Sequence, residues 1–306
     1  MTDKVTNKVR TPDTTVTQTP RQRRWLRLLL ADKVSLVAAV VIVLIILAAI
    51  LAPLLAPYSP SDQDLNSILS GPSGAHLLGT DDLGRDLLSR LIYGARVSLE
   101  ASVIAVGVGL LIGVPVGLAA GYFGRWIDAI LMRIVDTLLA FPALVLAIGV
   151  GAALGRGLVQ AMIAVGIVFA PILARLVRGQ VLTLRKRLFI EVATTYGTST
   201  GRMIRRHVIP NVMRPVIVQA TFLLAIGLLA EASLSFLGLG VQPPTASWGT
   251  MLQSSFQFIT VAPSQIFAPG IAIAITVLSF NLLGDFLNDV LDPNTPLRPR
   301  RKRRRA

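Results

Sequence analysis

The sequence predicts an all-α fold, that of a polytopic membrane protein with six transmembrane helices. Its 306 residues are 53% hydrophobic and only 15% charged, whereas soluble domains carry about 25% charged residues. Several long stretches contain no Asp, Glu, Lys or Arg, and a span needs about 20 mostly apolar residues. These uncharged stretches are residues 34–61, 101–124, 137–155, 157–174, 215–230 and 232–284.

The distribution of basic residues is the third observation behind this fold class. Of the 30 Lys and Arg residues, 26 lie in four segments: residues 1–33, 125–133, 175–214 and 298–305. Segments rich in Lys and Arg remain in the cytoplasm. We therefore expect both termini and residues 175–214 on the cytoplasmic side, which agrees with six spans.

The N-terminal third alternates between polar and apolar segments. Residues 1–33 are Thr-rich and basic, and we expect a disordered cytoplasmic tail there. Residues 34–57 are the first predicted transmembrane helix, whose apolar run is closed by prolines. Residues 58–98 are mixed in character and are expected to be extracytoplasmic, with a short amphipathic helix at residues 87–96 on the outer surface.

Residues 99–292 are predicted to form a core of five transmembrane helices, followed by a basic cytoplasmic tail at 293–306. Pro142 predicts a kink, and Asp136 is expected to pair with Arg133 or with a basic residue of the cytoplasmic loop. A short interfacial helix is expected at the outer surface. The five spans are expected at residues 99–121, 127–152, 157–177, 213–238 and 266–287, and the interfacial helix at 252–259.

The segment between the fourth and fifth of the six spans, residues 180–211, contains signals for two short helices and a turn between them. Its middle can continue a helix until Gly197, which can adopt positive φ and turn the chain. Thr198 or Ser199 can cap a second helix. Pro210 is expected to end or kink that helix, because proline disfavours helix at the preceding residue. The pattern predicts a short helix–turn–helix exposed to water.

The second helix of this loop is expected to be amphipathic. An alternative interpretation is an ordinary basic connector held at the lipid surface, and spacing alone fits either. The predicted apolar face carries Met203, Ile204, His207 and Val208, and the predicted polar face carries Arg202, Arg205 and Arg206.

The loop resembles the cytoplasmic EAA loop of permease subunits in ATP-binding-cassette importers. The pattern of that loop is Glu-Ala-Ala, three residues, Gly, nine residues, and Ile-x-Leu-Pro. Glu191, Ala193, Gly197 and Pro210 match it at the same spacings. Three positions depart mildly from the pattern and leave the helix–turn–helix intact: Val192, His207 and Ile209.

Further stretches resemble the dipeptide, oligopeptide and nickel permease group, and in particular its second, or C, subunit. Residues 78–86 read Leu-Gly-Thr-Asp-Asp-Leu-Gly-Arg-Asp, and residues 230–238 read Ala-Glu-Ala-Ser-Leu-Ser-Phe-Leu-Gly. Residues 281–285 and 291–293 resemble the C-terminal end of that group. The resemblance extends from about residue 30 to residue 297.

This resemblance implies a type I ABC-importer permease fold, with five core helices and an extra first helix, in a bacterial plasma (inner) membrane. It implies a second homologous permease subunit, two ATP-binding subunits and an extracytoplasmic solute-binding protein as partners. The ATP-binding subunits would hold ATP and Mg, and this chain would bind no cofactor. The residues implied in coupling to the ATPase are Glu191, Ala193, Gly197, Thr198, Ser199, Arg202, Arg205, Arg206, His207 and Pro210.

The function that follows from the resemblance is translocation of dipeptides or oligopeptides by alternating access. Nickel chelates, haem and other small solutes remain open as substrates, because their importers share these motifs. A membrane protein that does not transport is a further alternative.

Glu231 is an acidic residue predicted within a span. A carboxylate inside the membrane is costly and usually faces protein or water. Helix geometry places it roughly 25 Å from Arg214, in the outer half of the membrane. One hypothesis makes it a pathway-lining or gating residue, with Ser233 and Ser235 as further candidates, facing the paired subunit or a wet vestibule. The other makes it a packing carboxylate bonded to hydroxyls such as that of Ser233, or one close enough to the membrane surface to be hydrated.

The sequence argues against other function classes. It contains no HExxH, no paired-Asp or Ser/His pattern of an intramembrane hydrolase, and no Walker A motif. His76 and His207 are expected on opposite sides of the membrane, so they cannot share a metal ion. The absence of cysteine excludes disulfides and thiolate metal sites. The net charge of +14 lies at the membrane flanks, which argues for the lipid bilayer and against nucleic acid as a partner.

Overall fold

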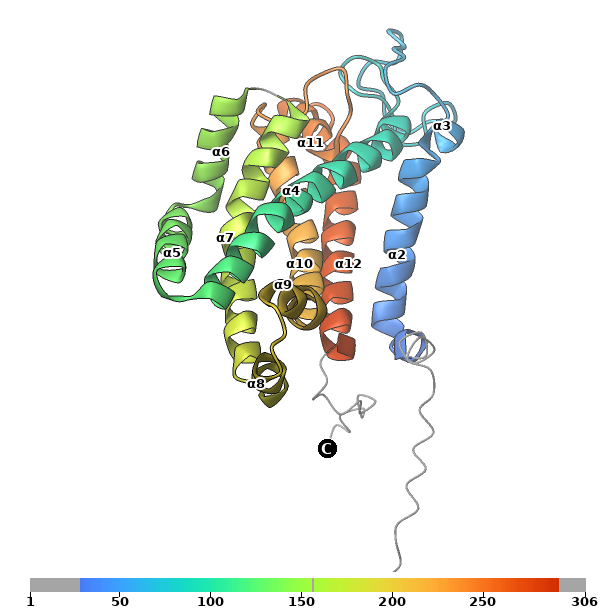
Figure 1. Ribbon diagram of the computed structural model, residues 1–306. Coiled ribbons are helices and arrows are strands. Elements are labelled where there is room, and N and C mark those ends of the chain that lie inside the picture. The colour runs from blue at the N-terminus through green and yellow to red at the C-terminus, as the bar shows by residue number, and fades with distance from the viewer. Residues whose placement is uncertain (1–27, 156, 292–306) are drawn as a thin grey trace, which may run out of the picture.

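The computed structural model describes residues 28–155 and 157–291, and within these residues the chain forms helices and turns without strands (Figure 1). The all-α class is therefore confirmed. The predicted N-terminal tail, apart from residues 28–33, and the predicted tail at 293–306 lie outside the described residues.

The first transmembrane helix is α2 (Lys33–Ile50), followed after one residue by the short α3 (Ala52–Leu55). Asp32 starts α2 by accepting a hydrogen bond from the Val34 amide at 3.4 Å, which satisfies one of the free N–H groups of the first turn. Most large side chains of α2 are exposed. This is the pattern of a helix that meets lipid on several sides.

One long helix, α4 (Leu87–Phe123), replaces two expected elements. We expected a separate amphipathic helix at residues 87–96 and a span at residues 99–121; this separation is wrong. No glycine or proline lies between the two segments to break the backbone ladder. Asp86 caps the helix, because its carboxylate accepts the Ser89 amide at 2.8 Å.

Four glycines of α4 allow its backbone to pack directly against α7 (Leu158–Arg185). They recur every four residues, so they share one face of α4. A Cβ atom at Gly113 would lie 2.5 Å from the Ala170 carbonyl oxygen and 2.8 Å from the Leu173 Cβ atom. Only glycine allows this approach of the two backbones. The four positions are Gly109, Gly113, Gly117 and Gly121.

The third expected span is broken into α5 (Arg125–Ala140) and α6 (Ala143–Leu154), which are bent by 100° at Phe141 and Pro142. Five helical stretches in the described residues are long and apolar enough to cross a membrane, and this pair makes a sixth if it counts as one span. Figure 1 shows α4 ending low in the view and α7 starting high, so α5 and α6 together connect the two ends. This arrangement agrees with the six predicted spans, the third of which is broken rather than kinked.

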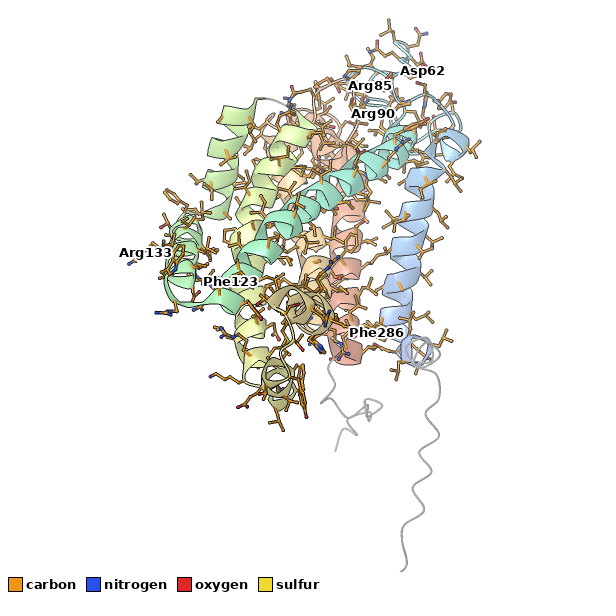
Figure 2. All side chains as sticks on the ribbon, viewed as in Figure 1. Asp62, Arg85, Arg90, Phe123, Arg133 and Phe286 are labelled. Atoms are coloured by element: carbon orange, nitrogen blue, oxygen red, sulfur yellow. The ribbon has the colours of Figure 1, made fainter. Side chains whose placement is uncertain are left out.

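The remaining elements comprise two long helices that run along the bundle, α10 and α12, and short elements at its two ends (Figure 1). We call the end that holds α8, α9 and the last residues of α12 the basic end, and the opposite end the α11 end (Figure 1). Figure 2 shows Arg85 and Arg90 at the α11 end and Phe286 at the basic end. These elements are α8 (Leu188–Thr195), α9 (Thr200–Met203), η1 (Ile204–Val208), α10 (Ile209–Phe236), α11 (Trp248–Gln257), η2 (Pro263–Ile266) and α12 (Phe267–Leu291).

The helix expected at residues 252–259 begins four residues earlier, at Trp248, as α11. Ser247 and Thr250 explain this start. The Ser247 hydroxyl accepts the Thr250 amide at 3.1 Å, and the Thr250 hydroxyl accepts the Ser247 amide at 2.9 Å. The two bonds form a capping box, a strong signal for a helix N-terminus.

Candidate functional site

The basic loop, residues 186–208, contains the turn that the sequence predicts at Gly197. α8 ends two residues before this glycine, whose φ is +74°. The Thr198 amide then donates to the Ala193 carbonyl oxygen at 3.1 Å, which closes a Schellman-type end. Ser199 occupies the N-cap position of α9, without a side-chain capping bond. The predicted helix–turn–helix is confirmed.

Pro210 does not end the second helix of the basic loop, so of the two expected outcomes, an end or a kink, the end is wrong. α9, η1 and α10 are contiguous, and they form one stretch from Thr200 to Phe236 that is long enough to span a membrane. The η1 segment is a π-turn in which the Ile209 amide donates to the Ile204 carbonyl. A π-turn places its hydrogen bonds five residues apart, and this wider turn directly precedes Pro210, which has no N–H to donate.

The two faces of the second helix are largely as predicted. Met203 and Val208 are buried, and Ile204 and His207 are half-buried. The His207 ring lies 6.3 Å from the ring of Phe189 in α8. The exposed residues of the loop include Glu191 and Tyr196, together with all three predicted arginines, Arg202, Arg205 and Arg206.

An apolar cluster holds the basic loop against two spans. It joins Ile190, Met203 and Val208 of the loop to α7 and α10, and Ala193 packs at its edge. Such a buried cluster fixes the loop, because moving the loop alone would expose apolar surface. The buried members contributed by the spans are Val177, Val181, Val212 and Val216.

The outward face of the loop is a basic hollow. Gly201, Arg202, Arg205 and Arg206 line an open depression of about 550 Å³. Arginine side chains offer fixed arrays of donors that suit carboxylates and phosphates. This face is therefore suited to docking an acidic surface of another protein.

Two ion pairs connect α5 to α7 just before the basic loop. Arg178 binds both carboxylate oxygens of Asp128, at 2.5 and 2.7 Å. Arg175 contacts Asp136 at 2.6 Å, and both of these side chains are largely exposed. Asp136 therefore contacts neither of the expected partners, Arg133 or a residue of the basic loop; its partner lies in α7, one turn before Arg178.

Glu231 lies near the α11 end of α10 and is 0% exposed. Its two carboxyl oxygens accept hydrogen bonds from the Ser98 and Ser235 hydroxyls, each at 2.8 Å. Residues of the same chain cover it, so the expected exposure to a vestibule or to the paired subunit is not what the structure shows. The packing interpretation is closer, but with different hydroxyls.

Ser233 and Ser235 differ in how they relate to Glu231. The Ser233 hydroxyl is exposed and donates to the Leu229 carbonyl at 2.8 Å. Ser235 is four residues from Glu231 and therefore lies on the same helical face. The helical period could have selected Ser235 over Ser233 as the bonding partner. Ser98 was missed, although it is a small polar residue on the face of α4 that also carries Gly94.

A second set of buried polar side chains lies at the α11 end, within residues 76–86. The sequence identifies this segment only by its resemblance to the family. Asp81 accepts from the Leu83 and Arg85 amides and pairs with the Arg85 guanidinium at 2.7 Å. His76 contacts the Asp86 carboxylate at 3.0 Å. These contacts fold the segment between α3 and α4 into a fixed cap.

Two further contacts join this cap to the rest of the α11 end. The Ser254 hydroxyl of α11 donates to Asp82 at 2.7 Å, and Gln265 of η2 donates to the Thr80 carbonyl at 2.7 Å. At the edge of the cap, a hydrogen bond from Ser67 lowers the pKa of the Asp64 carboxyl. No group of three or more His, Asp or Glu side chains in residues 28–155 and 157–291 is arranged to hold a metal ion.

Comparisons with known proteins agree with this geometry. The family model "Binding-protein-dependent transport system inner membrane component" matches residues 113–295, and the model "N-terminal TM domain of oligopeptide transport permease C" matches residues 19–72. The dipeptide transport system permease protein DppC of Alkalihalophilus pseudofirmus is 45% identical over 282 residues, which cover 92% of this chain and 93% of that protein.

A second relative and a solved structure extend the comparison. The glutathione transport system permease protein GsiD of Pectobacterium atrosepticum is 42% identical over 277 residues, which cover 90% of this chain and 92% of that protein. An inward-facing structure of the MetNI methionine ABC transporter aligns with a TM-score of 0.55 at 19% identity, over 67% of this chain and 97% of that chain. This last similarity concerns the fold alone.

The glycine-packed bundle, the helix–turn–helix at its basic end and the two family models lead to one assignment. The chain belongs to the binding-protein-dependent transport system inner membrane components and is a multi-pass inner-membrane permease subunit of an ABC importer, of the dipeptide and oligopeptide type.

Proposed function

We propose that this subunit translocates dipeptides or oligopeptides by alternating access, driven by ATP hydrolysis in separate subunits. The peptide substrate is supported by the two relatives, named for dipeptide and glutathione transport. Importers for nickel chelates, haem or other small solutes are the alternative, since the sequence motifs are common to them.

The main support for the proposal is the arrangement of buried and exposed side chains in the basic loop. Its inner face shares a buried cluster with α7 and α10, while its arginines face outward. A protein that docks on the arginines and moves would therefore move α7 and α10 as well. An element that transmits force needs both properties, a fixed attachment and a free polar face.

The assembly that we propose contains a second homologous permease subunit, two ATP-binding subunits and an extracytoplasmic solute-binding protein. ATP and Mg bind to the ATP-binding subunits, which dock on the basic loop. Catalysis of ATP hydrolysis therefore belongs to the partner chains. A nucleotide shifts the transporter between states only if those states bind it with different affinity.

We propose that the basic end faces the cytoplasm, with both termini there. The chain contains no cysteine, so single introduced cysteines report cleanly. In intact cells, an impermeant maleimide should label a Thr245→Cys variant and should label a Thr200→Cys variant only after lysis; both positions are exposed. External labelling at position 200 would contradict docking of an ATPase on the basic loop.

The proposed transport activity is tested in proteoliposomes that hold the complete importer. We expect uptake of a radiolabelled dipeptide that requires internal ATP, Mg and the solute-binding protein. A nickel chelate and haem, supplied in parallel, should not be taken up. Uptake of either of these without peptide uptake would establish the alternative substrate class.

A further inference from the structure

The buried carboxylate of Glu231 accepts from the Ser98 and Ser235 hydroxyls and also interacts with the hydroxyl of Ser247. The Ser98 and Ser235 hydroxyls each accept a hydrogen bond from a backbone amide in turn. The Ser98 hydroxyl accepts the Trp248 amide at 3.2 Å, and the Ser235 hydroxyl accepts the Val241 amide at 3.1 Å. A serine hydroxyl has a single proton to donate. In both serines that proton goes to Glu231.

These bonds join three parts of the α11 end. Ser98 belongs to α4, and Glu231 and Ser235 belong to α10. Val241 lies in the connection between α10 and α11, and Trp248 is the first residue of α11. The carboxylate therefore holds both the middle of this connection, at Val241, and the start of α11 against the two spans.

The close packing at the same point supports this arrangement. A Cβ atom at Gly249 would lie 2.7 Å from the Ser235 Cβ atom and 2.8 Å from the Ala232 Cα atom. The Trp248 indole donates to the Leu91 carbonyl at 3.0 Å, and a Cβ atom at Gly94 would lie 3.1 Å from the indole ring. α11 is thus seated directly on the backbones of α4 and α10.

We propose that Glu231 is a positioning residue that couples movement of α10 to the α10–α11 connection and to α11. The inference rests on the proposed function, in which the ATP-binding subunits dock on the basic loop. α10 continues directly from that loop and would move with it. The contiguous stretch from Thr200 to Phe236 extends roughly 55 Å at 1.5 Å per residue. Force applied at one end reaches α11 through the bonds that converge on Glu231.

The donor pattern predicts that glutamine is a poor substitute for Glu231, although it has nearly the same shape. Glutamine replaces one acceptor oxygen by an NH₂ donor. Whichever way the amide is turned, Ser98 or Ser235 faces a donor, and its own proton is left without an acceptor. A buried donor without a partner is costly.

The test is hydrogen–deuterium exchange on the complete importer in lipid nanodiscs, with and without a trapped nucleotide state. For Glu231→Gln we expect about tenfold faster amide exchange within residues 238–251, consistent with the loss of one buried hydrogen bond. Ser233→Ala is the matched control, because the Ser233 hydroxyl is exposed and bonds elsewhere; its exchange should equal that of the unsubstituted protein. Unchanged exchange in Glu231→Gln would overturn the proposal.

Two milder variants keep the proposal testable if Glu231→Gln does not assemble. Ser98→Ala should speed exchange of the Trp248 amide and leave that of Val241, whereas Ser235→Ala should do the reverse. If neither variant speeds exchange at its own amide, the carboxylate does not hold these segments.

The nucleotide response separates coupling from mere stabilisation. Trapping the nucleotide state should change exchange at residues 188–208 and at residues 238–251 in the unsubstituted importer. In Glu231→Gln, the first response should persist and the second should be lost. Persistence of both would overturn the inference, whereas absence of the first in the unsubstituted importer would instead overturn docking of the ATPase on the basic loop.

Discussion

The continuous helical stretch from Thr200 to Phe236 carries exposed charge at one end and a buried charged residue at the other. At the basic end, arginines stand exposed above a buried apolar cluster. At the α11 end, the Glu231 carboxylate is buried and receives its hydrogen bonds from neutral hydroxyls. Exposed charge is available to another protein and contributes little to stability, whereas a buried carboxylate must be satisfied within the fold. The first end is built to bind a partner and the second to hold its own chain together.

The largest effect on stability should come from removing the hydrogen-bond acceptor Glu231 at the α11 end. Glu231→Leu leaves the Ser98 and Ser235 hydroxyls without their acceptor, at a cost of about 3 kcal/mol. We expect a lower midpoint of thermal unfolding in detergent and less assembled subunit in membranes. Ser233→Ala, two residues away, should change neither quantity. An unfolding midpoint in Glu231→Leu equal to that of the unsubstituted protein would contradict the contrast between the two ends.

The turn of the basic loop should give the next largest effect. Gly197 has φ of +74° and open space where a Cβ atom would point, so only backbone strain opposes a side chain. Gly197→Val should cost about 1–3 kcal/mol locally and should uncouple uptake from ATP hydrolysis while the chain still inserts. Gly179→Ala, in α7 where an added Cβ atom meets nothing within 4 Å, is the control. Normal uptake per ATP in Gly197→Val would refute the role of the turn.

The ion pairs between α5 and α7 should rank below the turn. Asp128 binds Arg178 through both oxygens and is mostly buried, whereas Asp136 and Arg175 are largely exposed. Exposed pairs contribute about 0–1 kcal/mol. Asp128→Asn should therefore lower the unfolding midpoint more than Asp136→Asn, as measured on the same detergent preparation. Equal shifts would indicate that exposure does not set the strength of these pairs.

The smallest effect on stability should come from the exposed arginines. Arg205→Glu should change the free energy of unfolding by less than about 0.5 kcal/mol. It should nevertheless weaken binding of the ATP-binding subunits, and more strongly at low than at high salt, because salt screens exposed charges. Pull-down of these subunits at two salt concentrations measures this. Unaltered binding of the ATP-binding subunits to Arg205→Glu would contradict the assignment of the basic hollow as the docking face.

Sequence periodicity and residue chemistry predicted much of the fold. Uncharged stretches located the spans, and Gly197 marked a turn that the structure contains. The same reasoning failed where tertiary contacts decide. The 100° break between α5 and α6 is larger than a proline kink, and the π-turn before Pro210 lets a helix continue that local preference would end.

The contacts of the candidate site were less predictable than its location. Glu231 stood out because it is charged within a span, and Ser235 followed from the helical period. Ser98 could not be assigned, because it precedes Glu231 by 133 residues and only the packing of α4 on α10 brings the two together. The pairing of Asp136 with Arg175 has the same cause, since it spans 39 residues.

The glycines of α4 also limit the ways in which the bundle can rearrange. Side chains that interlock can slide by changing rotamer, but a backbone seated on a backbone has no rotamer to change. α4 and α7 should therefore move as one body, and the buried cluster at the basic end adds the loop and the start of α10 to it. The bundle then has fewer independent parts than helices, because the ion pairs of Arg178 and Arg175 also attach α5 to α7.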